Sequence, residues 1–309
     1  ANQKGAKLLA QREESALVTN LTRVLGALIT LIVLTWAVEL WLKMGFEWFD
    51  EQACLACLGL TLAIIFIRYP YNGDNKRLNL PWYDAFLAVL GIISCFYLCY
   101  IYGDIELNPY AMRPKMFILG LILLPLTWEA LRRTTGWSLT IVFSVFVAYS
   151  FVGHYVPGIM RGLEQEPVRL IAELGVTNVA LLGLPMKIIV LTVVLFIWMG
   201  QLLLHTGASE WFTDVAAALM GRSRGGSAKI AVVASGLFGS ISGSAVSNVA
   251  STGVITIPLM RQAGYDAKSA GAIEAVASTG GQIMPPIMGA AAFLMAELLE
   301  LEYTEIILA

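Results

Sequence analysis

Long apolar runs separated by short polar segments dominate the chain from residue 24 onward. Runs of roughly membrane-spanning size occupy residues 24–42, 52–68, 82–102, 116–131, 137–157 and 187–206. A helix needs about 20 apolar residues to cross a hydrocarbon core of about 30 Å, and backbone groups within lipid must pair inside the segment. The pattern therefore predicts six membrane-spanning helices, of which the fourth is short and is either tilted less or extended by its flanking residues.

Lys and Arg are distributed unevenly between the segments that join these runs. With a cytoplasmic N-terminus, fourteen of them fall on the inner side and five fall on the outer side, namely Lys43, Arg113, Lys115, Arg161 and Arg169. Basic residues are enriched in the cytoplasmic segments of membrane proteins. The distribution therefore predicts a multi-pass protein with its N-terminus in the cytoplasm.

The segment from Ile230 to Met260 departs from this regular alternation. It holds 31 residues without a charge. As one straight helix it would span about 46 Å, too long for a core of about 30 Å. Gly and Ser crowd its centre, and basic residues flank it on both sides, at 222–229, Arg261 and Lys268. The sequence therefore predicts a re-entrant helical hairpin over residues 230–260, with its tip near Gly239–Ser244 and both ends in the cytoplasm.

A second interruption follows within residues 270–296. Ala270 to Thr279 suits a helix, but the next residues are Gly280-Gly281-Gln282-Ile283-Met284-Pro285-Pro286. Two glycines and two prolines so close together cannot continue an α-helix. Apolar sequence resumes at Ile287 and is followed by glutamates without Lys or Arg, which suits the outer side. This stretch predicts a discontinuous membrane-spanning helix.

Both interruptions are expected at mid-membrane depth, where non-helical backbone is tolerated only inside protein or beside a water-filled cavity. Exposed helix N-termini attract anions, and unwound carbonyls with Ser and Asn oxygens suit a cation such as Na⁺. Small residues also serve close helix packing, but packing does not account for two prolines at mid-span. We therefore expect a substrate and ion site between the breaks. Glu274, an intramembrane carboxylate, is a further candidate, although its closeness to Lys268 also suits a position near the cytoplasmic interface.

Composition narrows the function classes. The chain is 58% hydrophobic and 14% charged, with a mean hydropathy of +0.73, whereas soluble domains are about 25% charged. The net charge of −2 argues against a nucleic-acid partner, which needs a clustered basic excess. The sequence offers no cluster of His or carboxylates at membrane depth, so we expect neither an enzyme with catalytic residues nor a bound cofactor.

One long segment resembles a known family. Residues 236–297, "GLFGSISGSAVSNVASTGVITIPLMRQAGYDAKSAGAIEAVASTGGQIMPPIMGAAAFLMAE", look like the large membrane subunit of the TRAP transporters (tripartite ATP-independent periplasmic transporters). The form "STGGQIMPPIMGAAAF" resembles the TAXI branch, in which small and large membrane subunits are fused. Residues 1–133 resemble the four-helix small subunit by span count and orientation, which implies a scaffold domain over 1–133 and a transport domain over 134–309.

The resemblance implies a role for particular residues. It places Ser242, Gly243, Ser244 and Asn248 at the inner hairpin tip. At the first broken helix it places Ser278, Thr279, Gly280, Gly281, Pro285 and Pro286. On this view Na⁺ is held through Ser244, Asn248 and Gly280.

The same resemblance implies a permease of the bacterial inner membrane that imports small organic anions, in particular carboxylates. Such transporters are Na⁺-coupled and elevator-like, and receive substrate from a periplasmic solute-binding receptor. The family's second repeat is absent from these 309 residues, so we expect the first half of an inverted-repeat fold, with transport belonging to the complete chain. A non-transporting scaffold or regulatory subunit and a passive channel remain alternatives.

Overall fold

The computed structural model describes residues 16–45, 48–71 and 80–308, and within these ranges every regular element is a helix. Six of the described helices are long and apolar enough to cross a membrane: Val18–Ala37, Asp50–Arg68, Trp82–Leu107, Pro109–Thr135, Trp137–Tyr155 and Leu184–His205. The predicted all-α, multi-span membrane fold is therefore confirmed.

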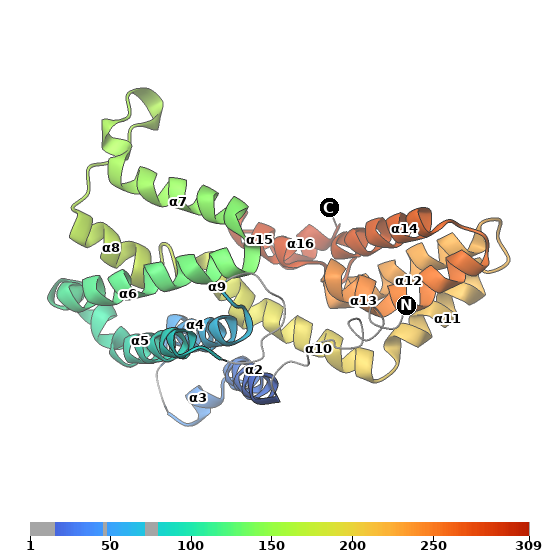
Figure 1. Cartoon of the computed structure of the whole chain (residues 1–309), viewed down its shortest axis with the longest axis horizontal. Helices are drawn as coiled ribbons and strands as arrows, with labels where there is room; N and C mark the ends of the chain where they lie inside the picture. Colours follow the sequence, from blue (N-terminus) through green and yellow to red (C-terminus); the bar gives the residue numbers. More distant parts are fainter. Residues whose placement is uncertain (1–15, 46–47, 72–79, 309) are drawn as a thin grey trace, which may run out of the picture. The chain divides into compact units, whose positions relative to one another are not determined.

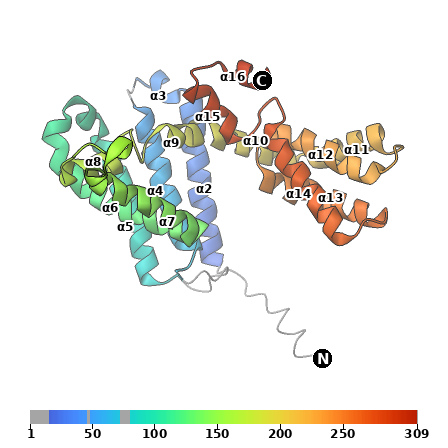
Figure 2. The ribbon, with the colours of Figure 1, turned by 90° about the horizontal axis from the view of Figure 1, so that it is seen from above.

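The chain divides into two units, Ala1–Val190 and Leu191–Ala309. In the first unit α4 packs against α2 and α5, and α6 packs against α8 (Figure 2). Its longer helices are α2 (Ala16–Ala37), α4 (Asp50–Arg68), α5 (Trp82–Leu107), α6 (Pro109–Thr135), α7 (Trp137–Val152) and α8 (Pro167–Val176), with the short α3 (Leu40–Lys43) and α9 (Leu184–Ile188).

The second unit is built around three helices that run alongside one another, α12 (Gly226–Ser242), α13 (Ala245–Gln262) and α14 (Ala267–Gly280) (Figure 1). Small side chains bring them close, since Ala231 and Ala270 are fully buried and form one cluster with Met260. The unit's other helices are α10 (Val194–His205), α11 (Ala208–Met220), the 3₁₀ turn η4 (Gly281–Ile283), α15 (Ala290–Leu298) and α16 (Tyr303–Leu308).

The two predicted breaks are both present. α12 ends at Ser242 and α13 begins at Ala245, so residues 230–260 form a helical hairpin rather than one rod. α14 ends at Gly280, and the chain becomes helical again over α15 from Ala290. The hairpin and the discontinuous helix are therefore confirmed, and each arm extends slightly beyond the predicted limits.

The limits of the first span were predicted wrongly. The first run was expected over 24–42, but α2 ends at Ala37 and the backbone turns at Glu39, whose φ is 52°. The helix already includes residues 16–23, and within it the Thr22 hydroxyl donates to the Val18 carbonyl of the preceding turn at 3.0 Å. The fourth run is extended by its flanking residues, which is one of the two possibilities that the sequence left open. Asn108 caps α6 by accepting from the Ala111 N–H, so α6 includes charged residues that hydropathy excluded.

The division of the chain after Val190 follows its internal packing. The boundary near residue 133 rests instead on resemblance to a two-subunit arrangement. That boundary separates two subunit-like parts and not two packing units, and it stays a prediction.

Candidate ion and substrate site

The hairpin tip is a two-residue connection between α12 and α13. Gly243 adopts the left-handed region with φ 60°, and its N–H donates to the Gly239 carbonyl to close α12. Ser244 is the N-cap of α13 and accepts at its hydroxyl from the Ser247 N–H at 3.3 Å. A Cβ at Gly243 would collide with the Met288 carbonyl oxygen. Glycine is therefore required here both by the backbone conformation and by the contact with the broken helix.

The break in the second helix lies directly against this tip. The Ile287 N–H donates to the Ser240 carbonyl at 3.0 Å, which joins the irregular segment to the end of α12. The Gly289 N–H donates to the Gln282 carbonyl at 2.7 Å and closes the loop on itself. The peptide bond between Pro285 and Pro286 is cis, and both prolines are exposed. The break is thus an ordered loop whose backbone is hydrogen-bonded to the hairpin.

Between tip and break lies a cavity of about 340 Å³. This volume is near the lower end of the range of small-molecule pockets, about 300–1,000 Å³. Its polar side is formed by residues of the two breaks and its apolar side includes two phenylalanines: Ser242, Gly243, Ser244, Gln282, Met288, Gly289, Phe196 and Phe293. The Ser242 hydroxyl is buried and has no hydrogen-bond partner in the described part of the chain, so it is available to a bound ion or solute.

Four helix ends meet at this cavity. α13 and α15 begin there, and the first residues of α15, Ala290 and Ala291, line the cavity without a side-chain cap. α12 and η4 end there, at Ser242 and Ile283. Helix N-termini carry partial positive charge and C-termini partial negative charge. The cavity therefore offers both an anion-favouring and a cation-favouring environment within a small volume.

Two of the predicted site residues lie away from this cavity, where the hairpin packs against α14. Asn248 is one turn into α13 and fully buried, and its side-chain amide donates to the Ser235 carbonyl at 2.7 Å and to the Ser278 carbonyl at 3.5 Å. Ser278 is also fully buried, and its hydroxyl donates to Glu274 at 3.1 Å. Asn248 and Ser278 thus tie α12, α13 and α14 together beneath the tip.

The remaining predicted residues are spread along the break. The Thr279 hydroxyl donates to its own helix, at the Ala275 carbonyl. Gly281 packs against Gly239, and a Cβ at Gly239 would lie 2.5 Å from the Gly281 Cα. A Cβ at Gly280 would meet nothing within 4 Å, and Gly280 lines a different depression from Ser244. The proposed Na⁺ ligands Ser244, Asn248 and Gly280 therefore do not line one common cavity.

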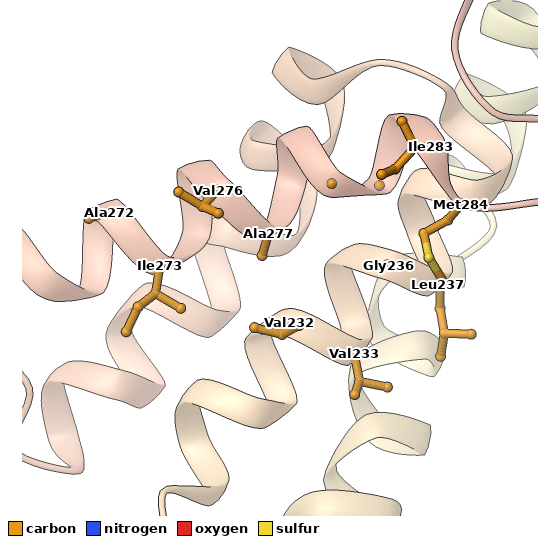
Figure 3. A pocket seen from close by; sticks show the side chains of 12 residues that line it. Val232, Val233, Gly236, Leu237, Ala272, Ile273, Val276, Ala277, Ile283 and Met284 are labelled. Carbon is orange, nitrogen blue, oxygen red and sulfur yellow. The ribbon is translucent and has the colours of Figure 1, made fainter. Parts of the chain in front are cut away.

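That second depression is an apolar groove of about 800 Å³ between α12 and α14. Figure 3 shows Ala277 on α14 pointing toward Val232 on α12, with Leu237 and Met284 at the end near the break. Its lining is almost entirely aliphatic, so it offers no ligand for an ion and no partner for a charged solute. The polar cavity at the tip is the better candidate for both.

Glu274 lies between α12, α13 and α14. It is fully buried. Four hydroxyls donate to its carboxylate, from Ser235, Thr252, Thr256 and Ser278. The structure decides that α14 turns this residue toward α12 and α13, whereas its depth in the membrane stays a prediction.

Comparison with known proteins assigns the chain to a family. The family model described as "Tripartite ATP-independent periplasmic transporter, DctM component" matches residues 121–309, which is more than half of the chain and includes both breaks. The chain belongs to the DctM family. It is therefore a member of a family of transporters rather than of enzymes.

Individual DctM relatives match at low identity. The isethionate TRAP transporter permease protein DctMQ of Oleidesulfovibrio alaskensis is 26% identical over 259 residues, 78% of this chain and 39% of the relative. The 2,3-diketo-L-gulonate TRAP transporter large permease protein YiaN of Escherichia coli is 28% identical over 131 residues, 41% of this chain and 29% of the relative. The sialic acid TRAP transporter permease protein SiaT of Haemophilus influenzae is 35% identical over 96 residues, 31% of this chain and 16% of the relative.

Each of these matches spans less than two fifths of the relative's own length. No solved structure matches the chain. The TRAP resemblance is confirmed by the family match, whereas the TAXI branch and fusion with a small subunit stay predictions.

Sequence reasoning missed three residues of the buried cluster in this DctM chain: Ser235, Thr252 and Thr256. A signal for two of them exists. Asn248, Thr252 and Thr256 follow one another at intervals of four along α13, and Glu274 and Ser278 do so along α14. Residues four apart share one face of a helix. A polar face on each of two apolar helices predicts that the two faces pack against each other. Only the packing identifies Ser235 of α12 as a further member of the cluster.

Proposed function

We propose that this chain is part of the membrane permease of a receptor-dependent, Na⁺-coupled secondary transporter that imports small organic anions. The observation that supports it most is the cavity between the hairpin tip and the break, where two helix N-termini and two helix C-termini meet. Membership of the DctM family supports the same general role. In this proposal the permease lies in the bacterial inner membrane, with its N-terminus in the cytoplasm.

The solute is proposed to bind through the N-terminal ends of α13 and α15. Free backbone N–H groups and the helix dipole favour a carboxylate or a similar anion. The apolar wall of Phe196 and Phe293, which are stacked with centroids 5.2 Å apart, then accommodates the carbon skeleton. The names of the relatives mention isethionate, 2,3-diketo-L-gulonate and sialic acid. We propose a small organic anion, and a carboxylate in particular.

Na⁺ is proposed to bind at the tip through the Ser242 and Ser244 hydroxyls and carbonyls at the end of α12. The Ser242 hydroxyl supports this placement, because it has no hydrogen-bond partner among the residues that the structure describes. Carbonyls at a helix C-terminus also suit a cation. In this proposal Asn248 does not contact Na⁺ and instead supports the site indirectly, because its amide holds the two arms of the hairpin together. Gly280 lines the apolar groove instead of the cavity, so this proposal gives it no direct contact with Na⁺.

The transport step is proposed to be an elevator-type movement of the hairpin and the broken helix together. The backbone hydrogen bond from Ile287 to Ser240 and the contact between Gly239 and Gly281 support movement as one body. Residues 1–133 serve as the static scaffold in this proposal. A periplasmic solute-binding receptor delivers the substrate to the outer face.

The test is uptake into proteoliposomes that contain the native permease and its receptor protein. Uptake should require an inward Na⁺ gradient and should saturate with substrate. Ser244→Ala and Ser242→Ala should each lower Na⁺ affinity about tenfold, the effect of losing about 1.4 kcal/mol of ligand interaction. Ser223→Ala, which changes a serine in the loop before α12, is the matched control.

The alternatives give different results in the same assay. Flux that needs no ion gradient and does not saturate would indicate a passive channel. Absence of flux with the receptor present would indicate a scaffold or regulatory subunit. Uptake that ignores Na⁺ would contradict the coupling.

A further inference from the structure

Glu274 is bonded to hydroxyls contributed by all three central helices of the second unit. Its Oε1 accepts from Ser235 Oγ at 2.8 Å, from Thr252 Oγ1 at 2.7 Å and from Ser278 Oγ at 3.1 Å. Its Oε2 accepts from Thr256 Oγ1 at 2.5 Å. The side chains of Glu274, Thr252, Thr256 and Ser278 are fully buried, and so is Ser235. This set of five residues is called the hydroxyl cluster below.

No basic group neutralises Glu274 among the residues that the structure describes. The charged side chains on α12, α13 and α14 are Lys229, Arg261 and Lys268, and all three are exposed. On α11, Glu210 and Asp214 are exposed too, and η4 carries no titratable residue. The half-buried Tyr265, after α13, packs beside the Ala231–Met260–Ala270 cluster. None of these groups forms an ion pair or hydrogen bond with Glu274, so hydroxyls alone determine its surroundings.

A shell of hydroxyls suits both protonation states of a carboxyl group. Each Ser or Thr hydroxyl is a donor of one hydrogen and an acceptor with two lone pairs, and it rotates freely. The ionised carboxylate can receive up to four donated hydrogens here. The neutral acid needs one acceptor, which any of the four oxygens can supply after a rotation. A shell of Lys, Arg or backbone N–H donors would instead stabilise only the ionised form.

The spacing favours a proton over a metal ion as the ligand. The carboxylate and hydroxyl oxygens are already in direct hydrogen-bond contact at 2.5–3.1 Å, so a coordinated metal ion would have to separate them. The described residues also hold no group of three or more His, Cys, Asp or Glu that could bind a metal. A proton needs no additional space.

The hydroxyl cluster is connected to the candidate substrate cavity. Thr252 Oγ1 lies 3.2 Å from the Asn248 side-chain oxygen, and the Asn248 amide donates to the Ser235 carbonyl. The Asn248 N–H in turn donates to the carbonyl of Ser244, which lines the cavity. A change of charge at Glu274 therefore acts on hydrogen bonds that set the position of the hairpin tip.

We propose that Glu274 and its four hydroxyl partners form a proton-binding site that is loaded and unloaded during the transport cycle. A hydronium ion on one side of the membrane gives up the proton, which forms an O–H bond with one carboxylate oxygen. On release that O–H bond breaks and water on the other side accepts the proton, so no oxidant or reductant takes part. The link to substrate movement rests on the function proposed above, whereas the binding of a proton does not. Intramembrane carboxylates that face a protein interior commonly act in this way.

The first experiment is infrared difference spectroscopy of the purified permease over roughly pH 4 to pH 9. The absorption of protonated carboxyl groups should contain a component that is missing in Glu274→Gln. The matched control is Glu297→Gln, which changes an exposed glutamate of the same unit. Spectra of the wild type and Glu274→Gln that agree over the whole range would overturn the proposal.

A second variant keeps the carboxyl group and so does not depend on the folding of Glu274→Gln. Thr256→Val removes one donor that only the ionised form needs. The frequency of the carboxyl absorption should then differ from that of the wild type, because the carboxyl group has lost one hydrogen-bond partner. A carboxyl absorption identical to that of the wild type would contradict the role of the hydroxyls.

The transport link is tested with a pH-sensitive dye enclosed in proteoliposomes. Substrate entry should acidify the lumen. Glu274→Gln, which mimics the neutral acid, should retain substrate exchange within about twofold but lose this acidification. Equal loss of exchange and acidification, or retention of both, would indicate a purely structural role. An infrared signal without any transport would instead overturn the proposed function and leave the proton site standing.

Discussion

Asn248 donates from its side-chain amide to the backbone carbonyl of Ser235 at 2.7 Å, and this bond joins the two arms of the hairpin. Both residues are fully buried. The bond matters because the hairpin leaves helical form at Gly243–Ser244, where no continuous backbone ladder connects α12 to α13. Side-chain bonds must therefore contribute to holding the arms in register.

Replacement of this amide should loosen the hairpin. Asn248→Ala removes the bond to Ser235 and leaves Thr252 without one acceptor, so we expect a loss of about 1–3 kcal/mol. The measurement is thermal unfolding of the purified protein in detergent. Gln262→Ala, an exposed change at the end of the same helix, is the control. Equal melting temperatures for the two variants would contradict this role.

The contact between Gly239 and Gly281 should not tolerate a methyl group. A Cβ at Gly239 would lie 2.5 Å from the Gly281 Cα, and backbone cannot withdraw as a flexible side chain can. We expect Gly239→Ala to cost about 1–3 kcal/mol through overpacking and to reduce uptake. The same substitution at Gly271 meets nothing within 4 Å, and there it should stabilise α14 by up to about 1 kcal/mol. Equal melting temperatures for Gly239→Ala and Gly271→Ala would show that the contact between Gly239 and Gly281 does not limit the size of the side chain at position 239.

A buried ion pair should be important for the first unit. Arg133 Nη1 lies 2.7 Å from Asp84 Oδ1, and the two side chains are 2% and 0% exposed. Arg133→Met leaves the carboxylate buried without this partner, so we expect a loss of about 3–5 kcal/mol. The double variant Asp84→Leu/Arg133→Met should recover part of that loss, because it removes both charges. Denaturant unfolding of the single and double variants gives the comparison.

The exposed ion pair between Arg169 and Glu173 provides the control for that prediction. Its geometry is as close, at 2.6 Å, but its side chains are 58% and 32% exposed. Water screens such a pair, so Arg169→Met should change stability very little. A large effect there, or a small one at Arg133, would show that burial is not what makes the first pair important.

The start of α14 should depend on pH. The pKa of Asp266 is lowered from its ordinary value of 3.8 mainly by a hydrogen bond from the Ser269 side chain, with further bonds from the Ser269 and Lys268 N–H groups. Its contribution to stability is present above pH 3.8 and is lost as pH falls through the lower pKa of the folded state.

The matching variants separate the charge of Asp266 from its capping role. Asp266→Asn keeps an N-cap oxygen and should remove this part of the pH dependence below pH 3.8, whereas Asp266→Ala should lower stability at neutral pH as well. Thermal unfolding at neutral and at acidic pH tests both. If the stability of Asp266→Asn falls with decreasing pH as steeply as that of the wild type, other groups cause the pH dependence.

Much of the architecture was predictable from the chain itself. A stretch of 31 uncharged residues between basic flanks is too long for one crossing and too rich in Gly and Ser for one helix. The Gly280–Pro286 stretch cannot continue a helix for equally local reasons. Hydropathy, charge and backbone chemistry are properties of short segments, so these predictions needed no knowledge of the packing.

The placement of Glu274 was not predictable in that way. Its sequence neighbourhood allows either an interfacial or an interior position, because Lys268 lies nearby and apolar residues lie on both sides. Only the approach of α12 and α13 supplies Ser235, Thr252 and Thr256 as partners. The same packing places Asn248 between the arms of the hairpin. The resemblance had placed it at the tip itself.

The amino-acid sequence thus determined on its own which segments are helical, where two of them break, and that the chain belongs in a membrane, since each of these follows from residues adjacent along the chain. Tertiary structure alone decided which polar groups share a buried cluster, which glycines are in backbone contact, and which residues line the cavity. Those relationships join residues far apart in sequence, and they depend on how closely three helices approach one another.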